Sequence, residues 1–275
     1  NQNPGRARRV EDFGFGVEVL MKAIEVHIAR LIDRARSAGF ETLVVTVDSL
    51  VASNREYNRR SGFSVPLRLT PRNIADCALH PGWTVSVLAR YLATTGVPRF
   101  RNIDSVKGPS LAKAPSSGFF SKSLSVTWEE LRHIRRTWSG RLIVKGILHP
   151  DDAVFALEAG ADAVVLSNHG GRSVDTAVHP ICVLPRVLEA VGDRIPILID
   201  GGITRGTMIA KALSMGASAV LIGRAPLYGV AAAGEAGATR ALAILRDELD
   251  RTLVQLGCTG VDQLNAEHLF SDTGN

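Results

Sequence analysis

The sequence predicts an α/β fold, a (β/α)8 TIM barrel that is incomplete at its N-terminus. Three observations support this prediction. From residue 140 onward, short apolar runs alternate strictly with helical patterns. The apolar runs are nearly continuous, which is typical of parallel strands covered on both faces. A chain of 275 residues is also long enough to form one barrel domain.

The regular part of the chain is predicted to consist of four strand–helix units. Strands are expected at RLIVKGI (141–147), ADAVVLS (161–167), IPILIDGG (195–202) and ASAVLIGR (217–224). Helices are expected at 150–160, 181–192, 204–216 and 233–256. Strict alternation of this kind builds right-handed βαβ units, so the strands should lie parallel.

Upstream, apolar residues at three-to-four spacing predict a helix over 24–39, and TLVVTVD (42–48) predicts another strand. VEVLM (17–21) is a weaker strand candidate. The count is then five clear strands and one doubtful one, whereas a closed barrel needs eight. Either further strands are hidden in the irregular segment, or the chain lacks its first units.

The alternation fails between residues 49 and 126. Six prolines interrupt this stretch, which we interpret as a lid or excursion within a single domain covering 1–275, with 1–23 atypical. LHPGWTVSVLARYLA (79–93) predicts a short helix inside it. Thr127 followed by Glu130 forms a capping-box pattern, which predicts a helix over 127–138.

Composition narrows the classes of partner. The net charge of +5 suits an anionic ligand or an acidic membrane surface. Nucleic acid is disfavoured, because the basic residues are scattered and aromatic residues make up only 5%. The three cysteines have no metal-binding spacing, and the polar N-terminus lacks the apolar core of a signal peptide. We therefore expect no metal site and a cytoplasmic location.

Polar or glycine residues follow every predicted strand. Active residues of a parallel barrel lie at the carboxyl ends of its strands, so these residues should meet at one mouth. They are Asp48, Lys145, Ser167 with His169 and Arg172, Asp200 with Gly201 and Gly202, and Gly223 with Arg224.

His169 and Asp48 have the chemistry of a general base and its orienting carboxylate; the alternative is a histidine whose hydrogen bonds are satisfied within a loop. Lys145 could face an electron-accepting ring, form a Schiff base, or pair with an interior aspartate. Arg172 and Arg55 offer planar forks for a substrate carboxylate, although Arg55 lies in the basic run NREYNRR and could belong to a solvated face.

Two glycine-containing loops have the pattern of a phosphate cradle. DGGITRG (200–206) precedes a predicted helix, and IGRAP (222–226) follows one strand–helix unit later. Glycines let backbone N–H groups approach an anion, and the loops after the last two barrel strands are the usual phosphate site.

Taken together, these residues resemble the FMN-dependent α-hydroxy acid oxidase/dehydrogenase family, which includes glycolate oxidase, L-lactate dehydrogenase and mandelate dehydrogenase. The resemblance covers about 24–275, and LRLTPRNIADCALHPGW is closer to the mandelate and lactate dehydrogenase branch. The matching blocks are TVDSLVASNRE, VKGIL, LSNHGGRSVD, LIDGGITRG and ALSMGASAVLIGRAPLYG.

The resemblance implies a role for each matching position. His169 would be the active-site base paired with Asp48, and Arg172 and Arg55 would bind the substrate carboxylate. Lys145 would lie near the N1–C2=O edge of FMN. The remaining FMN contacts would come from Thr46 and Ser167 at the isoalloxazine, Asp200 at the ribityl chain, and Gly201, Gly202, Arg205, Gly223 and Arg224 in the phosphate cradle. The reaction would oxidise an L-2-hydroxy acid, lactate- or mandelate-like, to the 2-keto acid.

The sequence also departs from the family. The family's N-terminal strands are not recognisable, and its Gln-x-Tyr falls on Glu18 and Leu20, neither of which can replace those side chains. The alternatives are therefore a truncated, catalytically impaired flavin- or phosphate-binding remnant, or another FMN barrel such as a type 2 isopentenyl-diphosphate isomerase. The motif SNHGGR followed by Asp175 argues against the isomerase, because its pair of a base and an arginine suits a carboxylate substrate.

The resemblance also bears on partners. The family's segment equivalent to 52–125 is a mobile lid, which in the mandelate dehydrogenase branch contacts a membrane. Here it combines basic and apolar residues, which suits either peripheral membrane contact at the inner face of the cell membrane or a solvated lid. A homo-oligomer is expected, and the electron acceptor, quinone or oxygen, is left open.

Overall fold

The computed structural model describes residues 28–49, 56–62, 64, 66, 68–99, 110–113 and 126–270. Contacts divide the chain into two units, 1–42 and 43–275. In the first unit, the described residues form a helix over 28–37, inside the range predicted for it. The doubtful strand at 17–21 lies outside the described residues, and the single-domain organisation stays a prediction.

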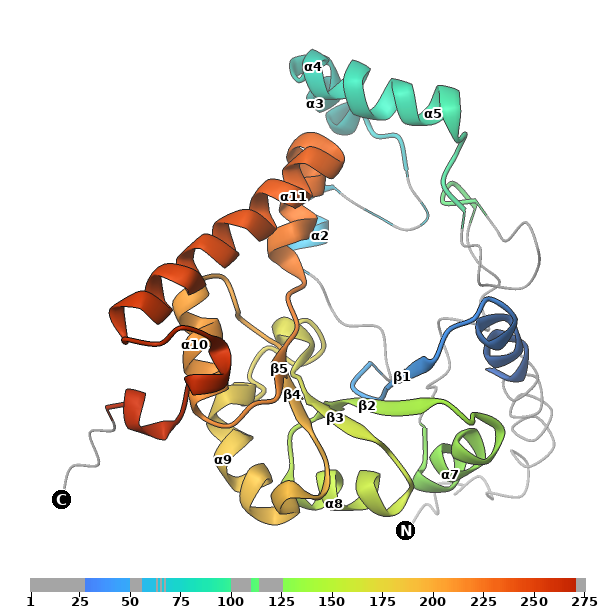
Figure 1. Cartoon of the computed structure of the whole chain (residues 1–275). Helices are drawn as coiled ribbons and strands as arrows, with labels where there is room; N and C mark the ends of the chain where they lie inside the picture. The colour runs from blue at the N-terminus through green and yellow to red at the C-terminus, as the bar shows by residue number, and fades with distance from the viewer. Residues whose placement is uncertain are drawn as a thin grey trace, which may run out of the picture. The chain divides into compact units, whose positions relative to one another are not determined.

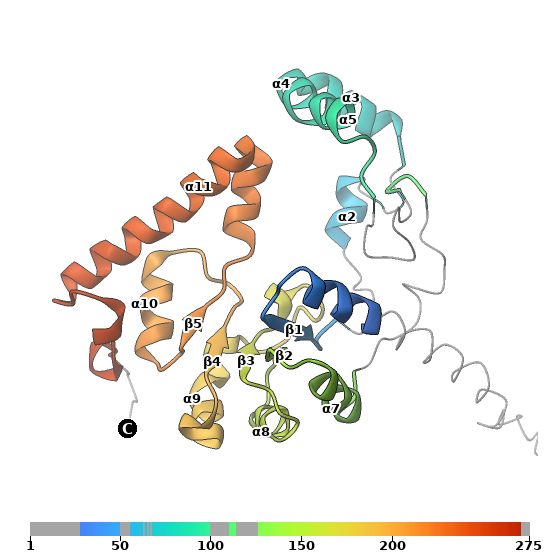
Figure 2. The ribbon, with the colours of Figure 1, turned by 45° about the vertical axis from the view of Figure 1, so that its right-hand side comes forward.

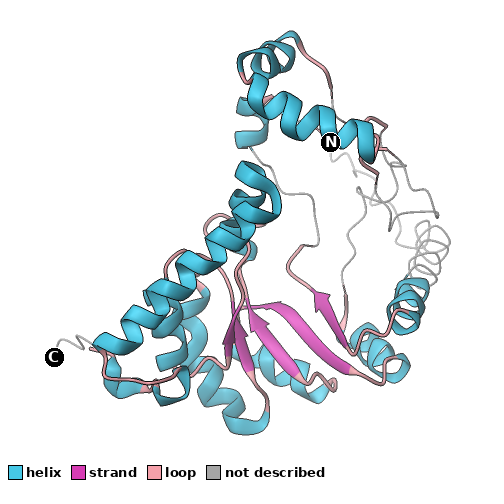
Figure 3. Ribbon diagram, turned by 45° about the horizontal axis from the view of Figure 1, so that its top comes forward, coloured by secondary structure: helices cyan, strands magenta, loops and turns pink. Residues whose placement is uncertain are grey.

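Five strands form one sheet in chain order. Figure 1 labels the strands, and Figure 3 draws them in magenta. The neighbouring pairs from the second strand to the fifth are parallel. This is the parallel (β/α) arrangement that the sequence predicts. Every predicted strand from residue 42 onward is present, β2 at its predicted length and the others in shorter form. The strands are β1 (Thr42–Thr46), β2 (Arg141–Ile147), β3 (Ala163–Leu166), β4 (Ile197–Ile199) and β5 (Ala219–Val220).

Helices follow the strands and cover one face of the sheet. α8 (Pro150–Glu158) packs on β2 and β3, α9 (Pro180–Val191) on β3 and β4, and α10 (Gly206–Ser214) on β5. Val144, Val164 and Ile197 are register partners, and all three are buried beneath these helices. Each such burial stabilises the fold by about 1.5–3 kcal/mol.

The other face of the sheet carries the functional side chains. Lys145, Val165 and Leu198 form the next register row, so they point away from the helices. Lys145 and Leu198 are only half-buried. The alternation along β2 and β4 thus separates a structural face from a face available for chemistry, whereas β3 is buried on both faces.

α7 (Trp128–Thr137) confirms the predicted capping box. The Thr127 hydroxyl accepts from the Glu130 backbone N–H, and the Glu130 carboxylate accepts from the Thr127 N–H. At the other end, the Arg135 guanidinium lies 2.8 Å from Asp162, whose carboxylate also accepts from the Leu142 N–H. These contacts hold α7 against the beginnings of β2 and β3.

α11 (Arg224–Gln255) begins nine residues before the predicted start, and its backbone is non-helical at Ala233 and Gly234. The chain folds back tightly there. The two segments approach so closely that a Cβ on Gly237 would overlap the Gly229 carbonyl. The second half of α11 packs on α10 around Ala210, Leu253, Cys258 and Leu264. Short 3-10 turns follow α11 at η5 (Val261–Gln263) and η6 (Ala266–His268), and another, η4 (Gly192–Arg194), lies between α9 and β4.

The irregular segment contains more helix than the sequence predicts. The expected helix at 79–93 is present as α4 (Pro81–Trp83), the π-helical η2 (Thr84–Ala89) and α5 (Arg90–Thr94), which run on from one another (Figure 2). The sequence prediction missed α2 (Glu56–Ser61) and α3 (Pro71–Leu79). Pro71 looks like a helix breaker, but at the first position of α3 it costs no hydrogen bond, and Thr70 caps the helix by accepting from the Asn73 N–H.

Candidate active site

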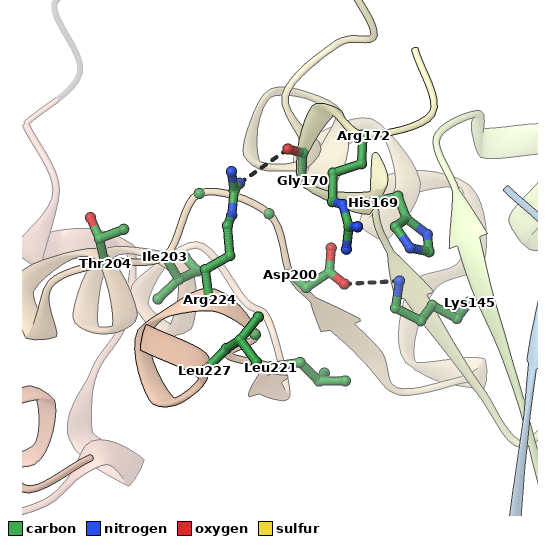
Figure 4. A pocket seen from close by; sticks show the side chains of 13 residues that line it. Lys145, His169, Gly170, Arg172, Asp200, Ile203, Thr204, Leu221, Arg224 and Leu227 are labelled. Atoms are coloured by element: carbon green, nitrogen blue, oxygen red, sulfur yellow. Dashed lines mark hydrogen bonds and ion pairs between the residues drawn. The ribbon is translucent and has the colours of Figure 1, made fainter. Parts of the chain in front are cut away.

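The strand ends meet in a pocket of about 330 Å³, within the size range of ligand sites. Figure 4 shows its lining side chains, which come from Lys145 on β2 and from the segments that follow β3, β4 and β5. Predicted site residues supply most of the polar lining. The polar side chains are Lys145, His169, Arg172, Asp200, Thr204 and Arg224.

Asp48 and His169 form the pair that the sequence predicts. The Nδ1 atom of His169 lies 3.0 Å from the Oδ1 atom of Asp48 and 3.0 Å from the hydroxyl oxygen of Ser49. A carboxylate only accepts hydrogen bonds, so Nδ1 carries the proton and Nε2 keeps its lone pair. The ring is therefore arranged as a base whose proton-accepting nitrogen is Nε2.

Ser167 connects this pair to a second ion pair. Its fully buried hydroxyl accepts from the Lys145 Nζ at 2.8 Å and lies 3.5 Å from the Asp48 Oδ2. The Lys145 Nζ also lies 3.0 Å from the Asp200 Oδ2. Lys145 therefore has an interior aspartate as its partner, one of the arrangements the sequence left open, and Asp200 balances the charge of this half-buried cation.

The backbone of the base is held in an unusual conformation. His169 has φ of 54°, within the 3-10 turn η3 (His169–Gly171). Such a φ is uncommon for a residue with a Cβ and marks positions that the surrounding structure must hold. Asn168, which is buried, holds this turn by accepting from the Gly170 N–H at 3.0 Å and by donating to the Val178 carbonyl.

The glycine loop after β4 has the geometry of an anion cradle. Gly201 and Gly202 have φ of 88° and 79°, and a Cβ on Gly201 would approach the Asn168 side chain within 3.0 Å. The Asp200 Oδ1 atom is buried without a hydrogen-bond partner. A buried carboxylate oxygen in a pocket calls for a donor such as a ligand hydroxyl, so the residues present fit a polyhydroxylated, phosphorylated cofactor.

The two arginines predicted for the phosphate lie in different surroundings. Arg224 lines the pocket and donates to the Gly170 carbonyl at 3.0 Å. Arg205 is absent from the lining; it is 67% exposed and lies 3.2 Å from Glu248. The neighbouring Thr204 lines the pocket instead.

Of the remaining predicted residues, some line the pocket and others do not. Gly223 and Arg172 line the pocket. Thr46 ends β1 with an exposed side chain and is not part of the lining. Arg55 lies outside the described residues. Sequence reasoning missed Ser49, Asn168 and Thr204; each directly neighbours a predicted residue, which was the only signal available.

Comparison with known proteins identifies the family. The family model for FMN-dependent dehydrogenases matches residues 15–271. The chain belongs to the FMN-dependent dehydrogenase family. This confirms the resemblance and, at the level of the family, FMN as the cofactor. It also argues against the isopentenyl-diphosphate isomerase alternative.

Similar proteins agree with this assignment. The chain is 38% identical to (S)-mandelate dehydrogenase of Pseudomonas putida, over 87% of this chain and 59% of that protein. It is 41% identical to a putative L-lactate dehydrogenase of Mycobacterium tuberculosis, over 87% of this chain and 56% of that protein. A crystal structure described as the monotopic membrane protein (S)-mandelate dehydrogenase superposes with a TM-score of 0.80, at 38% identity, over 88% of this chain and 63% of that one.

The chain thus spans less than two thirds of the length of these relatives. The family model's match over residues 15–271 spans all five described strands and the residues that line the pocket. The roles of the site residues, the activity and the substrate are matters for a proposal.

Proposed function

We propose that this chain carries the site for FMN-dependent oxidation of an L-2-hydroxy acid to the 2-keto acid. The observation that carries the proposal is the contact between His169 Nδ1 and Asp48 beside a pocket that also holds Lys145, Arg172 and the glycine cradle. A base, a carboxylate-binding cation and an anion cradle in one pocket match this reaction class.

The cofactor would be held by Lys145 on β2 and by the loops after β4 and β5. Asp200 would accept from a ribityl hydroxyl through its unpartnered Oδ1. The N–H groups around Gly202 and Gly223, with the Arg224 guanidinium, would bind the phosphate. Lys145 would place its positive charge at the ring edge where negative charge develops on reduction.

The substrate would bind at the His169 end of the pocket. Arg172 and Arg55 would bind its carboxylate, and His169 Nε2 would accept the proton lost on oxidation. Asp48 would stabilise the resulting imidazolium and keep the ring oriented. The oxidation removes two electrons and two protons from the substrate. His169 would take one proton, and FMN, when bound, would supply the acceptor for the two electrons and the other proton.

A spectrum of the purified protein tests this proposal. The protein is supplied with FMN, freed of excess flavin, and recorded before and after anaerobic addition of L-lactate or (S)-mandelate. We expect bound flavin whose visible absorption bleaches with one of the acids. Bound flavin that stays oxidised with both acids contradicts the reaction for these substrates. Failure to retain flavin contradicts the cofactor site and favours the impaired remnant.

We further propose that the helices of the irregular segment contact a membrane surface. α3, α4, η2 and α5 contain no buried residue. Within the described part of the chain no helix is long and apolar enough to cross a membrane. The surface instead combines Arg68, Arg72 and Arg90 with exposed apolar side chains, which suits binding at an anionic lipid interface. The exposed apolar residues are Leu69, Ile74, Leu79, Trp83, Val85, Val87, Tyr91 and Leu92.

Co-sedimentation with vesicles tests the membrane contact. We expect binding to vesicles that contain phosphatidylglycerol and weaker binding to pure phosphatidylcholine. Replacing Leu79 and Val85 by Asp together should abolish sedimentation while leaving the pocket intact. Sedimentation that is unchanged by this double variant would leave a solvated lid as the better interpretation. The electron acceptor and a homo-oligomeric state stay predictions.

A further inference from the structure

The turn that carries the base depends on outside contacts for its conformation. His169, Gly170 and Gly171 follow one another with φ of 54°, 65° and 71°. Three consecutive residues in the left-handed region are not an element that a chain maintains unaided. Asn168 accepts from the N–H groups of Gly170 and Gly171, whereas the Gly170 carbonyl accepts from a partner outside the turn.

That partner is Arg224, from the opposite side of the pocket. Its Nη2 atom lies 3.0 Å from the Gly170 carbonyl oxygen, across 54 positions of sequence, and Figure 4 shows this contact bridging the loop after β3 and the start of α11. A guanidinium has five N–H donors, and this contact uses one. The other donors remain available to an anion in the pocket that Arg224 lines.

The Arg224 guanidinium leaves no room for a side chain at Gly170, whereas Gly171 has free space around it. A Cβ on residue 170 would lie 2.7 Å from the Arg224 Nη2, whereas a Cβ on residue 171 would meet nothing within 4 Å. Both glycines have nearly the same positive φ, so alanine would strain the backbone about equally at both. Only at residue 170 would alanine also displace the guanidinium.

We infer that Arg224 is a positioning residue that couples the anion end of the pocket to the turn carrying His169. The Gly170 carbonyl holds an otherwise exposed guanidinium where an anion can bind it, and the guanidinium in turn restrains the base. Coupling of this kind is reciprocal, so an anion bound at Arg224 stiffens the turn. This inference deepens the proposed function, on which it rests for the identity of the anion.

The first test needs no cofactor. Amide hydrogen exchange at Gly170 and Gly171 is measured in the unliganded protein and in Arg224→Ala. Removing the anchor should speed exchange about tenfold, the effect expected from losing one charge-assisted hydrogen bond at an exposed site. Arg186→Ala is the control, because this exposed arginine on α9 makes the same change in charge away from the turn. Equal exchange in the two variants would overturn the inference.

The second test compares the two glycines. FMN affinity is measured by quenching of flavin fluorescence in Gly170→Ala and Gly171→Ala, with circular dichroism to confirm that both fold. Gly170→Ala should bind FMN about tenfold more weakly than Gly171→Ala, since only it displaces the guanidinium. Equal affinities would show that the two ends of the pocket are independent. If the parent chain binds no FMN, the proposed function fails while the exchange measurement still decides the coupling.

Discussion

The two ends of the pocket are built in opposite ways. At the base end, Asp48, Ser49, Ser167 and Lys145 hold His169 and one another through side-chain contacts of 2.8–3.5 Å. At the anion end, Gly201 and Gly202 offer backbone in the left-handed region. There the Asp200 Oδ1 has no partner, and the cation, Arg224, is exposed.

This difference shows which end the protein organises by itself. Catalytic groups must be in place before the substrate arrives, because orienting them during the reaction would raise its barrier. A cradle for a large anionic cofactor can leave donors and acceptors unpaired, because the cofactor completes them on binding. We therefore expect substitutions at the base end to lower the rate of flavin reduction, and substitutions at the anion end to lower cofactor affinity.

The largest effect should come from His169→Ala. Without the base, flavin reduction by the hydroxy acid should slow about 100- to 10,000-fold, while FMN affinity changes little. Stopped-flow absorbance of the flavin measures the first quantity and fluorescence titration the second. His179→Ala, an exposed histidine before α9 that does not line the pocket, is the control. If His169→Ala reduced the flavin at the parent rate, His169 would not be the base.

Asp48→Asn should have the next largest effect. The amide keeps the shape but loses the charge that stabilises the imidazolium, so reduction should slow about 10- to 1,000-fold. FMN affinity should again be nearly unchanged. Asp193→Asn, on an exposed turn, controls for the loss of one negative charge. Loss of affinity in step with rate would show that the two ends are not separable.

Arg224→Ala should act mainly on affinity. Loss of one charge-assisted contact to the phosphate should raise the Kd for FMN about tenfold. Isothermal titration with FMN, compared with riboflavin, measures this effect. Riboflavin has no phosphate, so its affinity should be less affected by the substitution. An equal loss for both flavins would argue that Arg224 does not contact the phosphate.

Arg205→Ala should have the smallest effect. Its guanidinium is largely exposed and pairs with Glu248 outside the pocket lining. A surface ion pair contributes about 0.2–1 kcal/mol, so the Kd for FMN should change less than about fivefold. If Arg205→Ala weakened FMN binding as much as Arg224→Ala, Arg205 would contact the phosphate, as the sequence resemblance implies.

The sequence by itself determined the strand that begins at residue 42 and the order of strands and helices from residue 127 onward, but not α2 and α3. Continuous apolar runs such as ADAVVL can only be buried strands here, and the capping residues of α7 are local signals. The site residues at strand ends were predictable for the same reason, since parallel strands bring their carboxyl ends to one mouth. The pairing of Asp48 with His169 followed from this topology and from the family resemblance.

Only the tertiary structure decided which neighbours point into the pocket. Thr204 and Arg205 are adjacent, yet the turn before α10 directs one to the pocket and leaves the other beside Glu248 on α11. Arg224 meets Gly170 only because the loops after β3 and β5 converge across the sheet. A side chain's direction depends on backbone angles and on packing partners far along the chain, and neither is encoded in local sequence pattern.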